Sequence, residues 1–357
     1  MYSVRGNRVQ FSMFGESHGT AIGMTIHGFP EGIEVDGVAI KAALSKRSTG
    51  GLFASQRQEV DEVHWISGIK NGVTTGAPLT FLIYNTDQKP KDYQQHGRIV
   101  RPSHADYPAH VRYNGYNDVN GGGMFSGRLT AVYVVAGTLC RQCLSMKGIQ
   151  INASIVQLGR LRLSLEAQHL ASRDKHDHVS WLQSLKGEWR ELVNSVLQEA
   201  QNNGDSIGGR VHLEATGLPV GLGEPQLYSF ESELSAWLFS IPGAKAVSFG
   251  LGEGFAEAMG SQVNDSAYID HGVVKHRSNN NGGIFGGLTN GMPLSLQVTF
   301  KPTPSIYKPQ DSIDVISMQP SALEIKGRHD PAFVIRTPII VECVTAMAIF
   351  DFMRSAF

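Results

Sequence analysis

Two histidines stand beside residues that could direct the transfer of a proton. His18 lies in the string Gly-Glu-Ser-His-Gly at residues 15–19, and His104 lies in Arg-Pro-Ser-His-Ala-Asp at residues 101–106. A carboxylate or a backbone carbonyl can fix the tautomer of a histidine and leave the other ring nitrogen to exchange a proton. The spacing predicts acid–base chemistry at both positions, although an ordinary turn or a solvated surface cluster would use the same residue types.

A third string of this kind lies near the end of the sequence. Residues 327–331 read Gly-Arg-His-Asp-Pro and bring Arg328 and Asp330 close together. Glycine lets the backbone approach a ligand, and arginine can bind phosphate or carboxylate through two parallel hydrogen bonds. The string indicates an anion site, with a solvated turn as the alternative.

Residues 15–19 also match the Gly-x-Ser-x-Gly motif of the α/β-hydrolases. That motif needs a strand before the serine and a helix after it. Residues 20–28 instead have the pattern of a strand, interrupted by Gly23. A serine hydrolase with Ser17 as its nucleophile is therefore the alternative enzyme class. We favour a glycine-flanked turn that offers the imidazole of His18 and backbone N–H groups to a ligand.

Two glycine-rich loops could hold an anion. Asn120 and three glycines precede a predicted helix, and a second loop covers residues 281–287. Neither loop matches the P-loop or the dinucleotide-binding fingerprint, but the N-terminus of a helix offers free N–H groups and a favourable dipole. Residues 301–305, Lys-Pro-Thr-Pro-Ser, add a cation and two hydroxyl groups after a predicted strand. These segments predict phosphate binding, with tight turns as the alternative.

The cysteines do not have the spacing of a metal or redox site. Cys140 and Cys143 lie well inside an apolar helical stretch, whereas a redox-active pair opens a helix, where the dipole lowers the thiol pKa. A zinc site would need a second pair, and Cys343 is the only other cysteine. His176 and His178 have no third ligand nearby. We therefore expect cysteines packed in the core and no metal.

The composition excludes several classes of protein. The chain has 357 residues, and 31 Lys and Arg against 32 Asp and Glu give a net charge of −1, which is a poor basis for binding nucleic acid non-specifically. An average glycine content of about 7% would give roughly 25 glycines, but there are 40. The N-terminus has no apolar signal region, no apolar run is long enough to span a membrane, and three cysteines do not make a disulfide framework. We expect a globular, cytoplasmic protein without a membrane or nucleic-acid partner.

Hydrophobic periodicity predicts elements of both kinds. Strands are expected at residues 9–14, 21–28, 79–84, 149–158, 209–215 and 294–300. Helices are expected at residues 36–44, 126–147, 181–200, 232–239 and 341–353. The elements do not alternate as in a doubly wound fold. The pattern therefore predicts the α+β class with antiparallel sheets, in one domain that spans residues 1–357.

The motifs together resemble the chorismate synthase family. The resemblance rests on residues 14–19, 75–78, 85–87, 101–106, 204–209, 217–225, 282–287, 301–305 and 327–331, whose order and spacing fit that family over almost the whole chain. Each motif alone is weak, but so many in the same order are very improbable by chance. The resemblance implies a layered β-α-β sandwich with helices between antiparallel sheets, and a homotetramer.

The family's activity is implied by the same resemblance. It is the conversion of enolpyruvylshikimate phosphate, a phosphorylated dicarboxylate, to chorismate and phosphate by anti elimination. This lyase reaction is the last common step of the shikimate pathway and depends on reduced FMN. His18 resembles the histidine that protonates reduced flavin, His104 the one that serves the departing phosphate, and Asp330 the carboxylate that helps flavin N5 take the ring proton. We expect a separate source of reduced flavin, since no reductase domain is visible.

The resemblance also implies which residues bind the flavin and the substrate. The positions that match flavin contacts are Met124, Phe125, Ser126, Pro242, Gly243, Gly286, Lys301, Pro302, Thr303, Pro304, Ser305 and Arg328, with Arg47 in a basic segment linked to NADPH or substrate. Because substrate and FMN are anionic and the chain is nearly neutral, cations must gather at the site. The expected substrate-binding residues are Arg47, Arg57, Arg101 and Arg128.

The sequence departs from the family pattern at several positions. Met124 and Leu129 stand where an arginine and a glutamate are common, Leu52 replaces a frequent basic residue, and Ser103 replaces a usual glycine. The changes at Met124 and Leu129 therefore suggest a third hypothesis, a non-catalytic flavin- or nucleotide-binding protein that has lost its activity.

Overall fold

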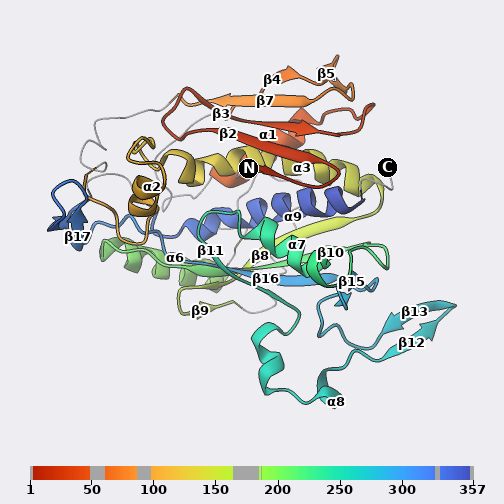
Figure 1. Cartoon of the computed structure of the whole chain (residues 1–357). Coiled ribbons are helices and arrows are strands. Elements are labelled where there is room, and N and C mark those ends of the chain that lie inside the picture. Colours follow the sequence, from red (N-terminus) through yellow and green to blue (C-terminus); the bar gives the residue numbers. More distant parts are fainter. Residues whose placement is uncertain are drawn as a thin grey trace.

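The computed structural model describes residues 3–48, 61–86, 98–163, 185, 187–325 and 330–353. Two five-stranded antiparallel sheets enclose a layer of helices, as Figure 1 shows. The strand order is β1-β2-β3-β7-β4 in the first sheet and β11-β16-β10-β8-β9 in the second. This arrangement confirms the predicted α+β class and the sandwich of helices between antiparallel sheets.

The first sheet is built mainly from the N-terminal part of the chain. Its strands are β1 (Val4–Arg5), β2 (Gln10–Gly15), β3 (Ala21–His27), β4 (His64–Ser67) and β7 (Leu79–Tyr84). Apolar residues alternate along β7, so that Leu79, Phe81 and Ile83 are buried and the residues between them are less so. One face of the sheet therefore packs on the helices. A small hairpin of β5 (Ile69–Lys70) and β6 (Val73–Thr74) follows β4.

The second sheet uses the middle of the chain. Its strands are β8 (Gln150–Leu158), β9 (Leu161–Arg162), β10 (Gly209–Thr216), β11 (Ala244–Phe249) and β16 (Leu294–Phe300). Strand β16, which lies between β11 and β10, alternates strictly, and every second residue from Leu294 to Phe300 is buried. This period of two orients one face of β16 toward the helices.

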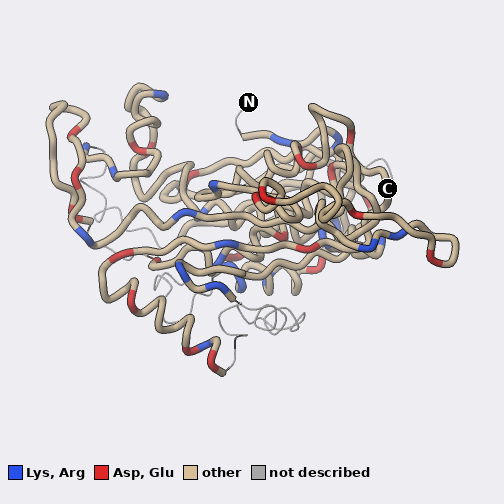
Figure 2. Tube along the Cα trace, turned by 90° about the horizontal axis from the view of Figure 1, so that it is seen from below, with Lys and Arg blue, Asp and Glu red and all other residues tan. Residues whose placement is uncertain are grey.

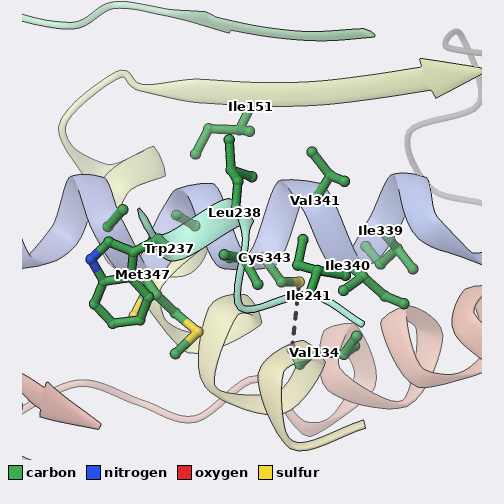
Figure 3. Close-up of a cluster of buried hydrophobic side chains, with 14 of the residues drawn as sticks. Val134, Ile151, Trp237, Leu238, Ile241, Ile339, Ile340, Val341, Cys343 and Met347 are labelled. Atoms are coloured by element: carbon green, nitrogen blue, oxygen red, sulfur yellow. Dashed lines mark hydrogen bonds between the residues drawn. The ribbon is translucent and has the colours of Figure 1, made fainter. Parts of the chain in front are cut away.

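The helices between the sheets are α1 (Gly37–Ser48), α3 (Thr130–Met146), α7 (Phe230–Leu238) and α9 (Thr337–Met353). Helix α3 packs against α9 and touches β3 of the first sheet, while α9 packs on β8 of the second. A Cβ atom on Gly137 would lie 2.3 Å from Cβ of Cys343, so only glycine allows this approach of the two helices. In Figure 3 the thiol of Cys343 reaches the carbonyl oxygen of Val134, at 3.6 Å.

All three cysteines belong to this core. Cys140, Cys143 and Cys343 are buried and free. Burial raises the pKa of the Cys343 thiol to about 12, well away from a reactive thiolate. The prediction that these cysteines pack in the core is confirmed.

Two helical segments are apolar enough to cross a membrane by length and composition. They are Gly127–Met146 and Phe333–Met353. The apolar windows of these segments are 72% and 83% buried inside the protein, because both helices lie between the sheets. Their composition is thus explained by the core that they form.

Several element boundaries differ from the predicted ones. Helix α6 (Gly187–Asn202) overlaps the predicted helix at residues 181–200. Leu185 is not helical and Gly187 has a φ of +59°, while residues 181–184 and 186 lie outside the described residues. Helix α9 begins four residues earlier than predicted, since Pro338 suits the first turn of a helix. Helix α7 begins at Phe230, where the hydroxyl of Ser229 accepts a hydrogen bond from the N–H of Ser232.

The short elements outside the sandwich were not predicted. They include α2 (Asp106–Arg112), α8 (Gly260–Val263), β12 (Ala267–Asp270), β13 (Val273–His276), β14 (Ile284–Phe285), β15 (Leu288–Thr289), β17 (Gln310–Asp314) and β18 (Gln319–Leu323). Helix α8 and the hairpin of β12 and β13 project from the sandwich in Figure 1. Acidic and basic residues are interspersed along the chain, as Figure 2 shows.

Candidate active site

Residues 15–19 form the turn between β2 and β3. Gly15 at the end of β2 pairs with Ile22 in β3, so a strand follows the serine. A nucleophile elbow needs a helix at that point. The structure therefore contradicts the serine hydrolase hypothesis and confirms the glycine-flanked turn.

The turn that carries His18 is held from two sides. Nδ2 of Asn85 donates hydrogen bonds to the carbonyl oxygens of Glu16 at 3.0 Å and Gly19 at 2.8 Å. The hydroxyl of Ser17, whose residue is only 1% exposed, lies 3.1 Å from Nδ1 of His18. This contact holds the Nδ1 side of the His18 ring.

A glycine loop after Asn120 lies against the His18 ring. A Cβ atom on Gly121 would lie 2.2 Å from Cε1 of His18, and Gly121 has a φ of +66°. Both the conformation and the space require glycine here. The N–H of Ser17 also donates to the carbonyl oxygen of Gly123 at 3.1 Å, which ties the two segments together.

His104 is fixed by a carboxylate, as its sequence neighbours predict. Nδ1 of His104 lies 2.5 Å from Oδ1 of Asp106. Arg101 donates to Asp106 through Nε and Nη2, each at 2.7 Å, and through Nη1 to the carbonyl oxygen of Gly121 at 2.7 Å. A Cβ on Gly122 would lie 3.6 Å from Nε2 of His104, so this nitrogen faces the glycine loop.

The charges around His104 stabilise the ionised form of Asp106. Burial alone raises the pKa of this carboxyl, but the hydrogen bonds and charges of Arg101 and His104 outweigh it, and the pKa of Asp106 lies well below its usual value. An ionised carboxylate at Nδ1 holds a proton on that nitrogen. Nε2 is therefore the atom of His104 that can exchange a proton with a ligand.

The glycine loop leads into a cavity lined by arginines. Ser126 accepts a hydrogen bond from the N–H of Arg128 and caps the turn Gly127–Leu129 that continues into α3. The cavity has a volume of about 230 Å³. Its wall includes charged, hydroxyl and aromatic side chains, among them Arg47, Ser126, Arg128, Asp330, Phe333 and Arg336.

Buried ion pairs hold the side chains of Arg47 and Arg128 in fixed positions in the cavity wall. Asp61 binds both Arg47, at 2.7 Å, and Arg128. Nε of Arg128 also donates to Oδ1 of Asn85 at 3.1 Å, so Asn85 joins the cavity to the turn that carries His18. Burial alone raises the pKa of Asp61, yet the two arginines lower it overall. Asp330 accepts a hydrogen bond from Arg336 at 3.1 Å.

Residues 301–305 follow β16 and reach the His104 loop. The side-chain Nζ of Lys301 donates a hydrogen bond to the carbonyl oxygen of Ser103. Its backbone N–H donates to the carbonyl oxygen of Gly243 at 3.0 Å. Ser103 has a φ of +59°, a conformation that favours the glycine usual in the family. Burial and the nearby charge of Lys245 lower the pKa of Lys301.

The structure brings together many of the predicted residues, but not all. Lys301 lies beside Gly243 and Ser103, while Phe125, which is 38% exposed, follows the glycine loop. Gly286 lies on the turn between β14 and β15, near the start of β16, whereas Lys301 follows its end. A strand of that length spans roughly 20 Å, so the single chain keeps Gly286 apart. Arg57 and Arg328 lie outside the described residues.

Three residues of the site had no role assigned from the sequence. Asp61 and Asn85 each connect functional candidates that are distant in the chain, and Arg336 binds the carboxylate of Asp330. Asp61 lies 14 positions from Arg47 and 67 from Arg128, so no local spacing could pair them. Asn85 belongs to a motif that supported the family resemblance, which was the only signal available.

The fold and the site define an enzyme for an anionic small molecule, with two oriented histidines beside a cavity lined by arginines. The family model described as chorismate synthase matches residues 9–353. Chorismate synthases of Thermococcus kodakarensis and Thermococcus gammatolerans are 40% and 41% identical to the chain, over 98% of it and 96% of their own lengths. A crystal structure of chorismate synthase superposes with a TM-score of 0.76 at 25% identity and covers 99% of the chain and 93% of its own.

The chain belongs to the chorismate synthase family. It is therefore an enzyme, a carbon–oxygen lyase of the shikimate pathway. The resemblance inferred from the motifs is confirmed.

Proposed function

We propose that the protein converts enolpyruvylshikimate phosphate to chorismate and inorganic phosphate by anti elimination, with reduced FMN bound beside the substrate. One observation carries the proposal. The loop at residues 120–128 contacts both histidines and leads directly into the arginine-lined cavity. A phosphorylated dicarboxylate needs concentrated cations, and a departing phosphate needs a nearby proton.

His104 is the proposed proton donor to the departing phosphate. Asp106 and Arg101 fix its ring, and Nε2 faces the glycine loop. Arg101 and Asp106 together carry no net charge, so a protonated His104 adds one positive charge beside the departing phosphate. The arginines proposed to hold the substrate anions are Arg47, Arg57, Arg101 and Arg128.

His18 and Asp330 are the other two proposed proton-transfer residues. His18 holds a proton beside the flavin site, with its ring fixed by Ser17 and Gly121. Asp330 lies in the wall of the cavity, where Arg336 fixes its carboxylate. From this position Asp330 assists the removal of the substrate's ring proton.

The residues present fit a group that carries a phosphate, as FMN does. Within the described part of the chain, Oγ1 of Thr303 is buried and has no hydrogen-bond partner. Lys301 lies close to the like charge of Lys245, and an anion would relieve the repulsion between them. We propose that Lys301, Thr303 and Ser305 hold the FMN phosphate.

The flavin ring is proposed to lie along the less polar candidates. These are Met124, Phe125, Ser126, Pro242, Gly243, Pro302 and Pro304; Arg328, which is also proposed to bind the flavin, lies outside the described residues. When bound, reduced flavin supplies an electron-rich ring, although the elimination as a whole neither oxidises nor reduces the substrate. Gly286 lies apart in the single chain, and in the homotetramer that the family resemblance implies a neighbouring copy can supply it.

An anaerobic assay with enolpyruvylshikimate phosphate and reduced FMN tests the proposal. We expect equal amounts of chorismate and phosphate. If the folded protein binds flavin but releases no phosphate, the replacements at Met124 and Leu129 have produced a flavin-binding protein without this activity. A parallel assay with oxidised FMN and NADPH should show no turnover, because we propose that a separate cytoplasmic source supplies the reduced flavin.

A further inference from the structure

One buried carboxylate joins two of the three arginines of the cavity wall, Arg47 and Arg128. Oδ2 of Asp61 accepts a hydrogen bond from Nη2 of Arg47 at 2.7 Å, and Oδ1 accepts one from Nη1 of Arg128. The side chain of Asp61 is 3% exposed, and those of the arginines are 8% and 5% exposed. Among the described residues the cavity wall includes both arginines but not Asp61, which therefore lies behind them.

The two carboxylate oxygens of Asp61 are both used. Each oxygen serves a different guanidinium group, so that two like charges lie side by side around one negative charge. Without that charge the guanidinium groups would repel each other, most strongly where little water screens them. Asp61 thus determines where both cations lie.

Arg47 keeps a donor for a ligand. In the described part of the chain, Nε of Arg47 is buried and has no hydrogen-bond partner. Such a buried donor costs free energy unless an acceptor reaches it. An anion that enters the cavity between the two arginines would provide that acceptor.

We infer that Asp61 is a positioning residue that orients Arg47 and Arg128 toward the phosphate of the substrate. This inference rests on the proposed function, because it assigns a part of the substrate to this cavity. Asp61 does not touch the substrate, and it acts only through the two arginines.

The alternative is that Asp61 only balances charge and stabilises the fold. Replacement by asparagine separates the two roles, because an amide has one acceptor oxygen and one donor NH₂ group. Asparagine can accept from one guanidinium only, and its NH₂ would face the other. One arginine must then turn away and lose its contact with the anion.

The test measures the binding of inorganic phosphate to the full chain by titration calorimetry, without flavin or substrate. We expect Asp61→Asn to bind phosphate tenfold or more weakly than the unmutated protein, the loss that corresponds to one charge-assisted hydrogen bond. Asp61→Glu keeps both acceptor oxygens, and its affinity for phosphate should lie between that of Asp61→Asn and that of the unmutated protein.

Asp351→Asn is the matched control. Asp351 is also a buried carboxylate, and it accepts hydrogen bonds from the backbone N–H groups of Asn7, Arg8 and Val9. Its loss should lower the melting temperature and leave phosphate affinity unchanged. Each variant is compared at a temperature where circular dichroism shows it folded.

Unchanged or tighter phosphate binding in Asp61→Asn overturns the inference, as does an absence of phosphate binding by the unmutated protein. If Asp61→Asn does not fold, Asp61→Glu decides, and an affinity equal to that of the unmutated protein overturns the inference. The proposed function fails differently, by normal phosphate binding without turnover of enolpyruvylshikimate phosphate.

Discussion

The ring of His104 and the carboxylate of Asp106 are joined by a contact of 2.5 Å between Nδ1 and Oδ1. Arg101 donates hydrogen bonds to the same carboxylate from Nε and Nη2, each at 2.7 Å. The three side chains form a unit that meets the glycine loop through Nε2 of His104 and through Nη1 of Arg101, which donates to the carbonyl oxygen of Gly121. This geometry leads to the first prediction.

Replacing His104 by alanine should slow the release of phosphate. A general acid commonly contributes a factor of about 100 or more, so we expect a loss of at least this size in kcat. Anaerobic single-turnover measurements of phosphate release check the prediction. An unchanged kcat would remove His104 from the mechanism.

Replacing Gly121 by alanine should displace His18. The new Cβ would lie 2.2 Å from Cε1 of the imidazole, so we expect turnover to fall by roughly a factor of 100, as for the loss of an acid–base group. The displaced ring should also show an altered proton resonance by NMR.

Gly148→Ala provides the control for that variant. Gly148 has a φ of +80°, but its Cβ would meet nothing within 4 Å. Both variants should lose about 1–2 kcal/mol of stability from the left-handed backbone. If both retain full activity, the position of His18 does not depend on Gly121.

Replacing Asp330 by asparagine should separate flavin binding from turnover. Asparagine retains an oxygen that can accept the hydrogen bond from Arg336, so the cavity should keep its shape. We expect reduced FMN to bind with unchanged affinity in an anaerobic absorbance titration, while kcat falls about 100-fold or more. Retained turnover would show that Asp330 takes no part in proton transfer.

Acid should destabilise the protein through Asp106. Its pKa is lowered in the folded state, so its stabilising effect is complete above the unfolded-state pKa of about 3.9 and is lost as the pH falls below it. In that range each such carboxylate lowers the free energy of unfolding by roughly 1.4 kcal/mol per pH unit. Urea unfolding between about pH 4 and pH 2 measures this slope.

Asp106→Asn removes the titrating group and should unfold with a shallower pH dependence over the same range. The comparison uses the slope, because the variant also loses ion pairs with Arg101 and His104. Equal slopes in both proteins would mean that other carboxylates control the acid transition.

The fold was predictable wherever the pattern was local. Strand β7 (Leu79–Tyr84) and strand β16 (Leu294–Phe300) occupy the predicted residues, because alternating burial leaves a period of two in the sequence. The apolar period of the α6 segment did not reveal that Leu185 is not helical and that Gly187 has a positive φ, because a single turn of the backbone leaves the period unchanged. The short strands outside the sandwich carry too few residues for any period to show.

The candidate site likewise contains some contacts that were predictable from the sequence and others that were not. His104 and Asp106 are two residues apart, so the sequence by itself determined that they could meet, and the motif order determined the family. Only the tertiary structure decided that Asp61 joins Arg47 to Arg128, that Asn85 links this cluster to the His18 turn, and that Gly286 lies apart from Lys301. The physical reason is that these contacts form between elements far apart in the chain, where the packing of sheets and helices, rather than residue spacing, sets which side chains meet.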